Sequence, residues 1–438
     1  MPSLHIRGGT LLTMRDGARA ERGDLLLSGS RLQEVGRVEA RDDSEILDAT
    51  GCYVMPGIVQ AHVHLVQTLM RGMAEDLPLL EWLRRRIWPL EAAHDEESLR
   101  ASVRLGLNEL LVTGTTCILD MGTSHGGDIV AEELVRSGIR ARFGQAMMDA
   151  GDGVPARLLE TTRASLDAGA GLRKRWDGQG AGRLGYAYAP RFALSCTRDL
   201  LEAVAALSRM NGTLIHTHSN ENADERALVE LATGRAPVAY LAEVGLLSGR
   251  AVVAHGVHLD DAELRLLAET GTSIAHCPSS NLKLGSGIAD VPRLRAARVN
   301  VGIGSDGAAC SNRLDGFEEV RLAALLARSR GNAGALSAGD ALLMATRDGA
   351  RALRLDDVGS LQPGFRADVV ILDAERLAPG GDPATRIVFG GGSRAVRDVI
   401  VNGDPLVRDG MPTRFDPVEV TARANEARAA LTTRASIG

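Results

Sequence analysis

Six of the ten histidines in this chain stand at the ends of short apolar segments, a pattern that can build a metal centre. Neutral imidazoles joined by one carboxylate suit zinc, with iron or manganese as alternatives. A site of this kind keeps a position for water and can lower the pKa of that water to around 7, which is the chemistry of metal-dependent hydrolysis. The six residues are His62, His64, His216, His218, His255 and His276.

Two pairs of histidines offer the first ligands. His62 and His64 lie two residues apart, so on a strand both side chains point to the same side and can reach one ion. Of the second pair, either His216 or His218 can supply a further ligand. We favour His218, because it is last on its segment and Glu221 follows shortly after it. His216 then lies one layer deeper, where we expect a hydrogen-bonded core histidine.

An aspartate offers the fourth ligand, and the scarcity of lysine indicates how many metal ions the centre holds. Asp306 follows a Gly-rich segment end, where it can cap a helix, but in the company of these histidines we expect a ligand. Two-metal barrel hydrolases often bridge their ions with a modified lysine on the fourth strand. The fourth segment, 184–189, has no lysine, and the chain contains only Lys174 and Lys283. We therefore expect one divalent metal ion per chain, Zn²⁺ first, with Fe²⁺ or Mn²⁺ as alternatives.

The elements that must position these residues alternate between short apolar strands and amphipathic helices. Eight candidate strands in this alternation predict an α/β fold, a (β/α)8 TIM-type barrel. In such barrels the chemistry lies at the carboxyl ends of the strands, which is where the six histidines fall. The candidate strands are 58–62, 115–120, 140–147, 184–189, 213–218, 251–255, 273–276 and 299–304.

The sequence pattern at both ends of the chain predicts short β-strands outside the barrel. We expect residues 1–56 and 361–438 to form one small composite β-sandwich beside a catalytic barrel at 57–360. Asn402-Gly403 is a strong hairpin signal, and a final helix is predicted at 418–433. The flanking strands are predicted at 4–7, 10–14, 24–28, 367–372, 386–389 and 396–403.

Composition excludes several classes of protein. The 438 residues carry a formal net charge of −6 and 24% charged side chains, which argues for a globular protein without a nucleic-acid footprint. No apolar run approaches the ~18 residues of a membrane span, and no signal-peptide pattern is visible at the N-terminus. Five scattered cysteines without a C-x-x-C pair favour a reducing compartment. We expect a cytoplasmic protein.

The sequence resembles the amidohydrolase superfamily over nearly its whole length. The similar branch holds guanine deaminases, 5′-deoxyadenosine and S-adenosylhomocysteine/methylthioadenosine deaminases, and s-triazine hydrolases. The resemblance is carried by residues 56–64, 82–91, 190–196, 218–221, 254–256, 276–284 and 304–308. It implies that the metal ligands are His62, His64, His218 and Asp306.

The resemblance also implies catalytic roles. Glu221 is expected to contact the substrate and to shuttle protons between its ring and the leaving group. His255 is expected to hydrogen-bond the attacking hydroxide rather than to bind the metal strongly. Asp306 is expected to double as the base that deprotonates the water. Together these roles predict an aminohydrolase that releases ammonia.

The residues expected to contact the substrate resemble different members of this family. Trp82 and Trp88 can form the wall of a flat heterocycle pocket or simply pack. Glu91 matches a position that takes ribose hydroxyls in nucleoside deaminases, whereas Arg191 stands in a Pro-Arg-Phe segment similar to that of guanine deaminases. The segment 307–312 resembles 5′-deoxyadenosine deaminases. We expect a heterocyclic small-molecule substrate, and first an adenine nucleoside: 5′-deoxyadenosine, methylthioadenosine, S-adenosylhomocysteine or adenosine.

Three alternatives and three residues stay open. Guanine deamination is the first alternative, s-triazine hydrolysis the second, and a non-catalytic scaffold is disfavoured because all four ligands are present. Analogy with other barrel enzymes predicts a homo-oligomer, a dimer or tetramer. Lys283 near the mouth of the barrel can be a gate residue or a surface lysine, and the roles of His216 and His276 are not assigned.

Overall fold

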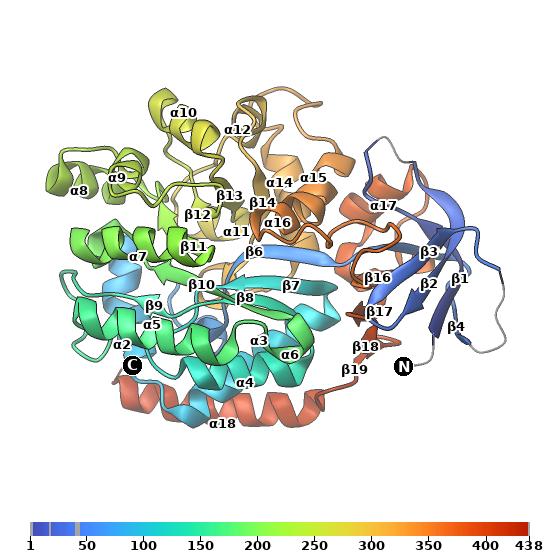
Figure 1. The fold of residues 1–438 in the computed structure, drawn as a ribbon, viewed down its shortest axis with the longest axis horizontal. Coiled ribbons are helices and arrows are strands. Elements are labelled where there is room, and N and C mark those ends of the chain that lie inside the picture. Colours follow the sequence, from blue (N-terminus) through green and yellow to red (C-terminus); the bar gives the residue numbers. More distant parts are fainter. Residues whose placement is uncertain (1–2, 17–18, 40–43, 437–438) are drawn as a thin grey trace.

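A closed barrel of parallel strands forms the centre of the computed structural model, which describes residues 3–16, 19–39 and 44–436 (Figure 1). Every barrel strand pairs with two neighbours, and β14 returns to β6 through Ile303 and Gln60. The predicted (β/α)8 barrel is confirmed. Its strands in chain order are β6 (Ile58–His64), β7 (Thr115–Asp120), β8 (Arg140–Phe143), β10 (Leu184–Pro190), β11 (Leu214–Ser219), β12 (Ala251–His255), β13 (Ser273–His276) and β14 (Val301–Ile303).

Three barrel strands have the predicted bounds, β6, β10 and β11 differ from the prediction by one or two residues at their ends, and two places differ more. β7, β12 and β13 have the predicted bounds. The predicted strand 140–147 is broken after Phe143, and a separate short strand, β9 (Ala146–Met147), follows. The predicted strand 299–304 shrinks to β14, and β15 (Asp306–Gly307) then pairs with the end of β6. This second pairing places Asp306 beside the two histidines of β6.

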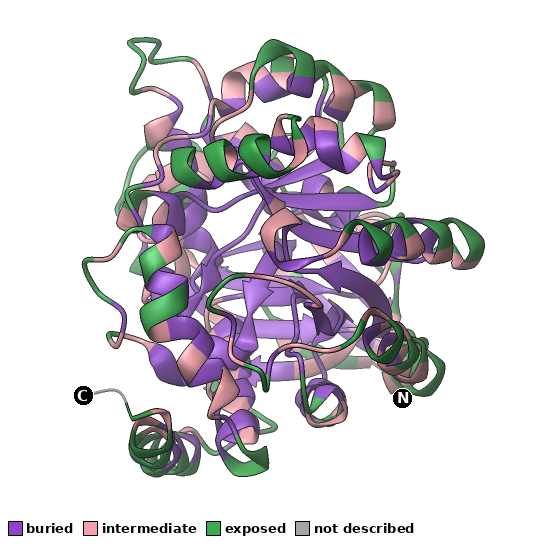
Figure 2. Ribbon diagram, turned by 90° about the vertical axis from the view of Figure 1, so that its left-hand side faces the viewer, coloured by how far each residue is buried: buried purple, intermediate pink, exposed green. Residues whose placement is uncertain are grey.

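Helices surround the barrel and bury their inner faces against it (Figure 2). The stretch after β6 contains η1 (Leu65–Met70), α1 (Leu79–Trp82), the π-helical turn η2 (Leu83–Ile87) and α2 (Trp88–Ala92). The remaining barrel helices are α3 (Glu96–Val112), α4 (Gly127–Ser137), α5 (Thr162–Trp176), α6 (Gln179–Gly182), η3 (Ala193–Ser195), α7 (Arg198–Asn211), α8 (Ala223–Thr233), α9 (Pro237–Glu243), α10 (Asp261–Thr270), α11 (Pro278–Lys283), α12 (Val291–Ala296), α13 (Ala308–Ser311), α14 (Gly316–Leu326), α15 (Ala338–Met344) and α16 (Arg347–Ala352).

The two ends of the chain pair into one β-domain at the side of the barrel (Figure 1). Its nine strands form one continuous hydrogen-bonded sheet, in which β5 and β16 join the N-terminal and C-terminal parts. The strands are β1 (Ser3–Leu11), β2 (Glu21–Ser28), β3 (Arg31–Gly36), β4 (Ser44–Asp48), β5 (Cys52–Pro56), β16 (Val369–Asp373), β17 (Val396–Val401), β18 (Asp404–Arg408) and β19 (Met411–Pro412). The division of the chain at 56/57 and 360/361 stays a prediction.

One predicted strand of the C-terminal part is wrong. Residues 386–389 lie in the helix α17 (Pro383–Gly390). The helix start signals prevail over the apolar run there, because Asp382 caps the backbone N–H of Thr385 and Pro383 occupies the first turn. Short 3-10 turns, η4 (Ala374–Arg376) and η5 (Gly392–Ala395), flank this helix.

Two other C-terminal predictions are confirmed. Asn402 and Gly403 join β17 to antiparallel β18 with φ of 55° and 81°, the left-handed backbone that a tight two-residue turn requires. The final helix α18 (Pro417–Ala435) extends the predicted 418–433 and packs along α3 below the barrel (Figure 1).

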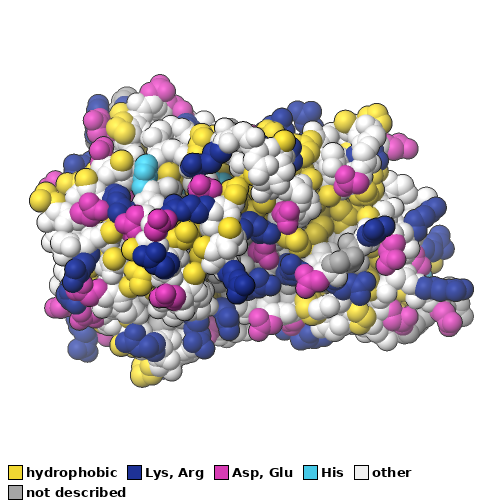
Figure 3. Space-filling view, turned by 90° about the horizontal axis from the view of Figure 1, so that it is seen from above, with side chains coloured by type: hydrophobic (Ala, Val, Ile, Leu, Met, Phe, Trp, Pro, Cys, Tyr) yellow, Lys and Arg dark blue, Asp and Glu magenta, His cyan; other side chains and the backbone are white. Residues whose placement is uncertain are grey.

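The surface charges, the helices and the cysteines relate to the expectations drawn from composition. Figure 3 shows cationic and acidic side chains interspersed over the face seen from above. Among the described residues no helix has both the length and the apolar character needed to cross a bilayer. All five cysteines are free and buried.

A buried ion pair fastens the barrel to the β-domain. The Arg140 guanidinium, at the start of β8, donates to both carboxylate oxygens of Asp368 at 2.6 and 3.0 Å. The side chains are 3% and 2% exposed. The backbone N–H of Asn402 donates to the same carboxylate at 2.7 Å. Both charges are therefore compensated only while the two parts of the fold stay together.

Replacing Asp368 by alanine is expected to lower the free energy of unfolding by about 3–5 kcal/mol, because a buried guanidinium loses its counter-ion. Chemical denaturation of wild type and variant measures the change. The matched control, Asp167→Ala, removes an ion pair with Arg163 whose side chains are 86% and 65% exposed. That control should change stability by no more than ~0.5 kcal/mol. Equal effects of the two substitutions would contradict a fastening role for Asp368.

Candidate active site

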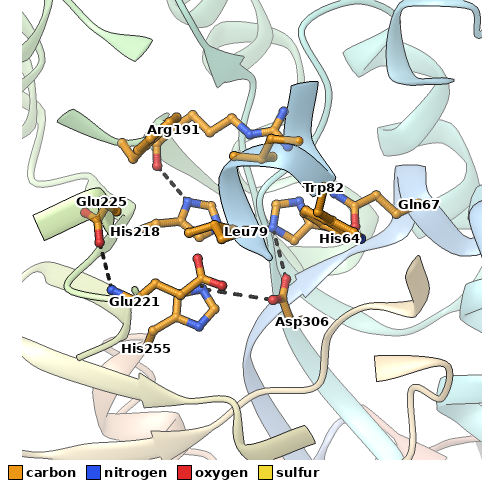
Figure 4. Close-up of a pocket in the computed structure, with 12 residues that line it drawn as sticks. His64, Gln67, Leu79, Trp82, Arg191, His218, Glu221, Glu225, His255 and Asp306 are labelled. Atoms are coloured by element: carbon orange, nitrogen blue, oxygen red, sulfur yellow. Dashed lines mark hydrogen bonds and ion pairs between the residues drawn. The ribbon is translucent and has the colours of Figure 1, made fainter. Parts of the chain in front are cut away.

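Three histidines and one aspartate converge at the carboxyl end of the barrel. Figure 4 shows three of these four residues, His64, His218 and Asp306. One nitrogen each of His62, His64 and His218 and one oxygen of Asp306 lie within 4.8 Å of one another. His64 Nε2 is 3.2 Å from His218 Nε2 and 3.3 Å from Asp306 Oδ1. His62 Nε2 is 3.2 Å from the same oxygen. The structure thus brings together all four predicted ligands.

The two strands that carry His62 and Asp306 can approach closely because residue 304 is glycine. A side chain at this position would place its Cβ 2.7 Å from the carbonyl oxygen of His62. His62 and His64 share a strand and point to the same side of it, as their spacing predicts.

The donor set fits a divalent cation. His218 donates its Nδ1–H to the carbonyl oxygen of Arg191 at 2.6 Å, so its Nε2 offers a lone pair to the cluster. Two nitrogen atoms that face each other at 3.2 Å, as His64 and His218 do, need either a proton or a cation between them. Three imidazoles and a carboxylate around one point are the ligands that zinc prefers.

A second group of side chains faces the cluster from the pocket. His255 Nε2 lies 3.4 Å from Glu221 Oε2 and 4.0 Å from Asp306 Oδ2. His255 Nε2 and Glu221 Oε1 are buried and have no hydrogen-bond partner among the residues that the structure describes. These unpartnered atoms leave polar groups available for a substrate or water.

Two residues of the site have a strained backbone conformation. His255 and Asp306 have φ of 77° and 60°, in the left-handed region that residues with a Cβ rarely adopt. Such conformations cost of order 1 kcal/mol or more each and persist where the surrounding structure enforces them. Here they turn both side chains towards the cluster at the ends of their strands.

Burial sets the protonation of these groups. It lowers the pKa of His64 and His218 well below the ordinary range and lowers the pKa of His255 to about 4. The imidazoles are therefore neutral and able to act as ligands or acceptors. Burial, with the Asp306 carboxylate nearby, raises the pKa of Glu221 well above its ordinary range. A carboxyl group of that kind can hold a proton for transfer.

Apolar and polar side chains together line the pocket over the cluster. Leu79, Trp82, Leu83 and Phe192 supply apolar surface. The other lining residues are His64, Gln67, Arg191, His218, Glu221, Glu225, His255 and Asp306. Trp82 thus takes the predicted position, whereas Trp88 is buried in the adjoining apolar core and does not line the pocket. Apolar and aromatic surface together with several convergent polar groups suits a flat heterocycle.

Glu91 does not lie on the pocket surface. Both of its carboxylate oxygens accept from Arg191, at 2.5 and 3.1 Å, and one also accepts from Gln67 Nε2 at 3.0 Å. The side chains of the ion pair are each 5% exposed. Arg191 lines the pocket as predicted, and Glu91 supports it from behind. A direct contact of Glu91 with ribose hydroxyls stays a prediction that this arrangement does not favour.

Three other residues singled out in the sequence lie beside the pocket rather than in it. Lys283, the last residue of α11, donates to Glu75 at 2.7 Å and to Asn312 at 2.8 Å, which ties the end of this helix to the segments that carry the other two residues. Cys277 is buried, and burial raises the pKa of its thiol well above the ordinary value, so it is no thiolate nucleophile. His276 is buried and does not line the pocket.

Sequence reasoning missed the residues that support the site from behind. Ser280 donates to Asp306 Oδ2 at 2.6 Å, and Asn281 Oδ1 lies 2.9 Å from His255 Nδ1. Glu225 accepts from the backbone N–H of Glu221 at 2.9 Å, and Asp120 accepts from the N–H of Leu65 at 2.9 Å. For the first pair, a signal was available in the segment 276–284, which carries the family resemblance.

Comparison with known proteins agrees with this geometry. A model of the amidohydrolase family matches residues 53–406. A 5-methylthioadenosine/S-adenosylhomocysteine deaminase of Haloarcula marismortui is 37% identical, with 99% of this chain and 100% of that protein covered. A 5′-deoxyadenosine deaminase of Methanothermobacter thermautotrophicus is 38% identical, with coverage of 98% and 99%.

Solved structures show the same fold. An adenosine deaminase from Xanthomonas campestris with bound zinc superposes with a TM-score of 0.92 at 31% identity, over 98% of both chains. A zinc-bound atrazine chlorohydrolase from Arthrobacter aurescens gives 0.90 at 26% identity, covering 97% and 100%. Guanine deaminase from E. coli gives 0.84 at 28% identity, covering 93% and 100%.

Proposed function

This chain belongs to the amidohydrolase family, and we propose that it is a metal-dependent deaminase of an adenine nucleoside. A hydrolase of C–N bonds that releases ammonia follows from the family and the deaminase relatives. The observation that carries the finer proposal is the placement of Glu221. A buried carboxyl of raised pKa lies against His255, and both face the histidine–aspartate cluster from a pocket with an aromatic wall.

The proposed roles follow from these positions. His62, His64, His218 and Asp306 would hold one divalent metal ion, with zinc first. When bound, such an ion supplies a nucleophile by lowering the pKa of water. Glu221 would donate its proton to the ring nitrogen next to the amino-bearing carbon, while Asp306 would take one proton from the attacking water. The second proton of that water would pass through Glu221 to the departing amine, so that ammonia leaves, and the proton on Asp306 then restores Glu221. His255 Nε2 would hydrogen-bond the attacking oxygen. Arg191 and Trp82 orient the heterocycle.

The relatives and the site favour an adenine nucleoside over the two alternatives. The two relatives described above act, by name, on adenosine derivatives with modified 5′ positions. The guanine deaminase and the atrazine chlorohydrolase share the fold at lower sequence identity. Glu221 also favours deamination, because a departing amine needs a proton whereas chloride does not. A homo-oligomeric state and a cytoplasmic location stay predictions.

Metal content tests the proposed centre. We expect about one divalent ion per chain in active protein, because the four ligands converge on one point and the fourth barrel strand, β10, contains no lysine that could bridge two ions. Elemental analysis of active and chelator-treated protein measures this. Removal of the ion should abolish ammonia release, and restoring one equivalent should recover it. Two equivalents in fully active protein would contradict the single-metal proposal.

Replacing Glu91 by glutamine tests how the pocket holds Arg191. The substitution removes the counter-charge of a buried guanidinium, so we expect kcat/KM to fall by similar factors for nucleosides and for free purine bases. Steady-state ammonia release with paired nucleosides and bases measures it. The matched control is Glu81→Gln, which changes a pair with Arg85 whose side chains are 62% and 57% exposed, and it should leave both rates unchanged. A loss confined to nucleosides would show that Glu91 itself binds ribose hydroxyls.

A further inference from the structure

His216 lies beside the histidine–aspartate cluster and contacts one of its members, His62. Its Nε2 is 2.6 Å from His62 Nδ1, and the two rings meet edge to face with centroids 4.8 Å apart. The residue is fully buried, and within the described part of the chain its other nitrogen, Nδ1, has no hydrogen-bond partner. Nothing in the proposed deamination uses this side chain.

The position of the His62 imidazole proton follows from the direction in which the cluster lies. His62 turns Nε2 towards Asp306 and the other ligands, so this nitrogen must offer a lone pair to a metal ion. A neutral imidazole has one N–H, which then resides on His62 Nδ1 and is donated to His216 Nε2. His216 must therefore carry its own proton on Nδ1, where no partner receives it.

That arrangement is expensive for the fold. A buried N–H group without a partner costs about 1–3 kcal/mol. An apolar side chain of similar size at this position would avoid the cost. This cost is explained if Nε2, the other nitrogen of the His216 ring, has a function that requires a histidine at this position.

We propose that His216 is a positioning residue, which fixes the tautomer and ring orientation of His62 and thereby tightens metal binding. Histidine ligands generally pass their second N–H to a carboxylate, a carbonyl oxygen or water. His218 follows that rule through the carbonyl oxygen of Arg191. His62 has a neutral imidazole as acceptor instead, so its orientation is fixed without a further negative charge beside the ion. This inference rests on the proposed metal centre.

Metal affinity is the direct test, because it does not depend on turnover. His216→Leu removes the acceptor, and we expect metal dissociation constants to rise by about 10–100-fold in competition with a chromophoric chelator. His216→Gln places an amide oxygen near His62 Nδ1, and we expect an affinity close to that of wild type. Saturating metal should restore ammonia release by His216→Leu.

His276 supplies the matched control. It is also a buried histidine at the end of a barrel strand with an unpartnered Nδ1, but its ring forms no hydrogen bond to a cluster member among the described residues. His276→Leu should keep the wild-type metal affinity. If His216→Leu binds metal as tightly as His276→Leu does, the inference is overturned.

A measurement on the wild-type protein covers the case in which His216→Leu does not fold. In metal-loaded protein labelled with ¹⁵N-histidine, the His216 signal, identified by its loss in His216→Gln, should show the Nδ1–H tautomer. An Nε2–H tautomer would overturn the inference. Wild-type protein that binds no metal would instead contradict the proposed centre itself.

Discussion

A Glu221→Gln variant is expected to bind metal and substrate as wild type does, while its kcat falls by at least about 100-fold. Glutamine keeps the size and hydrogen-bonding capacity of the side chain but cannot transfer a proton. Glu221 follows β11 closely, and its carboxyl lies 3.4 Å from His255 in the buried part of the pocket. Deamination needs this carboxyl twice, once for the ring nitrogen and once for the departing amine.

Glu225→Gln is the matched control for this prediction. Glu225 is a second buried glutamate of the pocket, and its role in the structure is to accept the backbone N–H of Glu221. Glutamine keeps an acceptor oxygen there, so kcat should fall far less than for Glu221→Gln. Ammonia release under saturating substrate measures both variants. A Glu221→Gln enzyme with near wild-type kcat would show that the proton takes another route.

His218→Asn and His255→Asn are expected to fail in different ways. His218 Nε2 faces His64 and the cluster, so its loss should empty the metal site and abolish activity. His255 belongs to the group formed with Glu221 and Asp306 and hydrogen-bonds Asn281 through its other nitrogen. Its loss should leave metal bound but lower kcat by ~10²–10³-fold, as the loss of one stabilising group commonly does.

The two readouts must be taken on the same preparations. Metal content after dialysis and kcat at saturating metal separate loss of the ion from loss of chemistry. Added metal should not restore His255→Asn, because that variant already holds its ion. If His255→Asn loses metal as completely as His218→Asn, then His255 is a ligand and the proposed roles of the two histidines are wrong.

Much of the barrel was predictable because its signals are local. A buried strand requires a short run of apolar residues, and a barrel strand ends where this run gives way to polar residues. β7, β12 and β13 follow that rule with the predicted bounds. The β-domain was harder, because its strands pair residues far apart in the chain. The strand predicted at 386–389 failed where the Asp382 cap and Pro383 dictate a helix.

The cluster was accessible to sequence reasoning because ligand types and strand ends coincide. Its supporting contacts were not. Arg191 binds Glu91 because the closed barrel brings α2 next to the end of β10, 100 residues further along the chain, which no local pattern encodes. The hydrogen bond between His62 and His216 likewise joins two strands 154 residues apart. The sequence favoured a core role for His216, but the partner is visible only in three dimensions.

Ammonia release by metal-loaded wild-type protein across a panel of substrates tests the proposed function most directly. The panel contains 5′-deoxyadenosine, methylthioadenosine, S-adenosylhomocysteine and adenosine, with guanine and amino- and chloro-substituted s-triazines as competitors. The predicted result is that an adenine nucleoside with a modified 5′ position gives the highest kcat/KM, in the range of about 10⁴–10⁸ M⁻¹s⁻¹ usual for enzymes. Faster deamination of guanine, or chloride release from a chlorotriazine in place of ammonia release from any nucleoside, would contradict it.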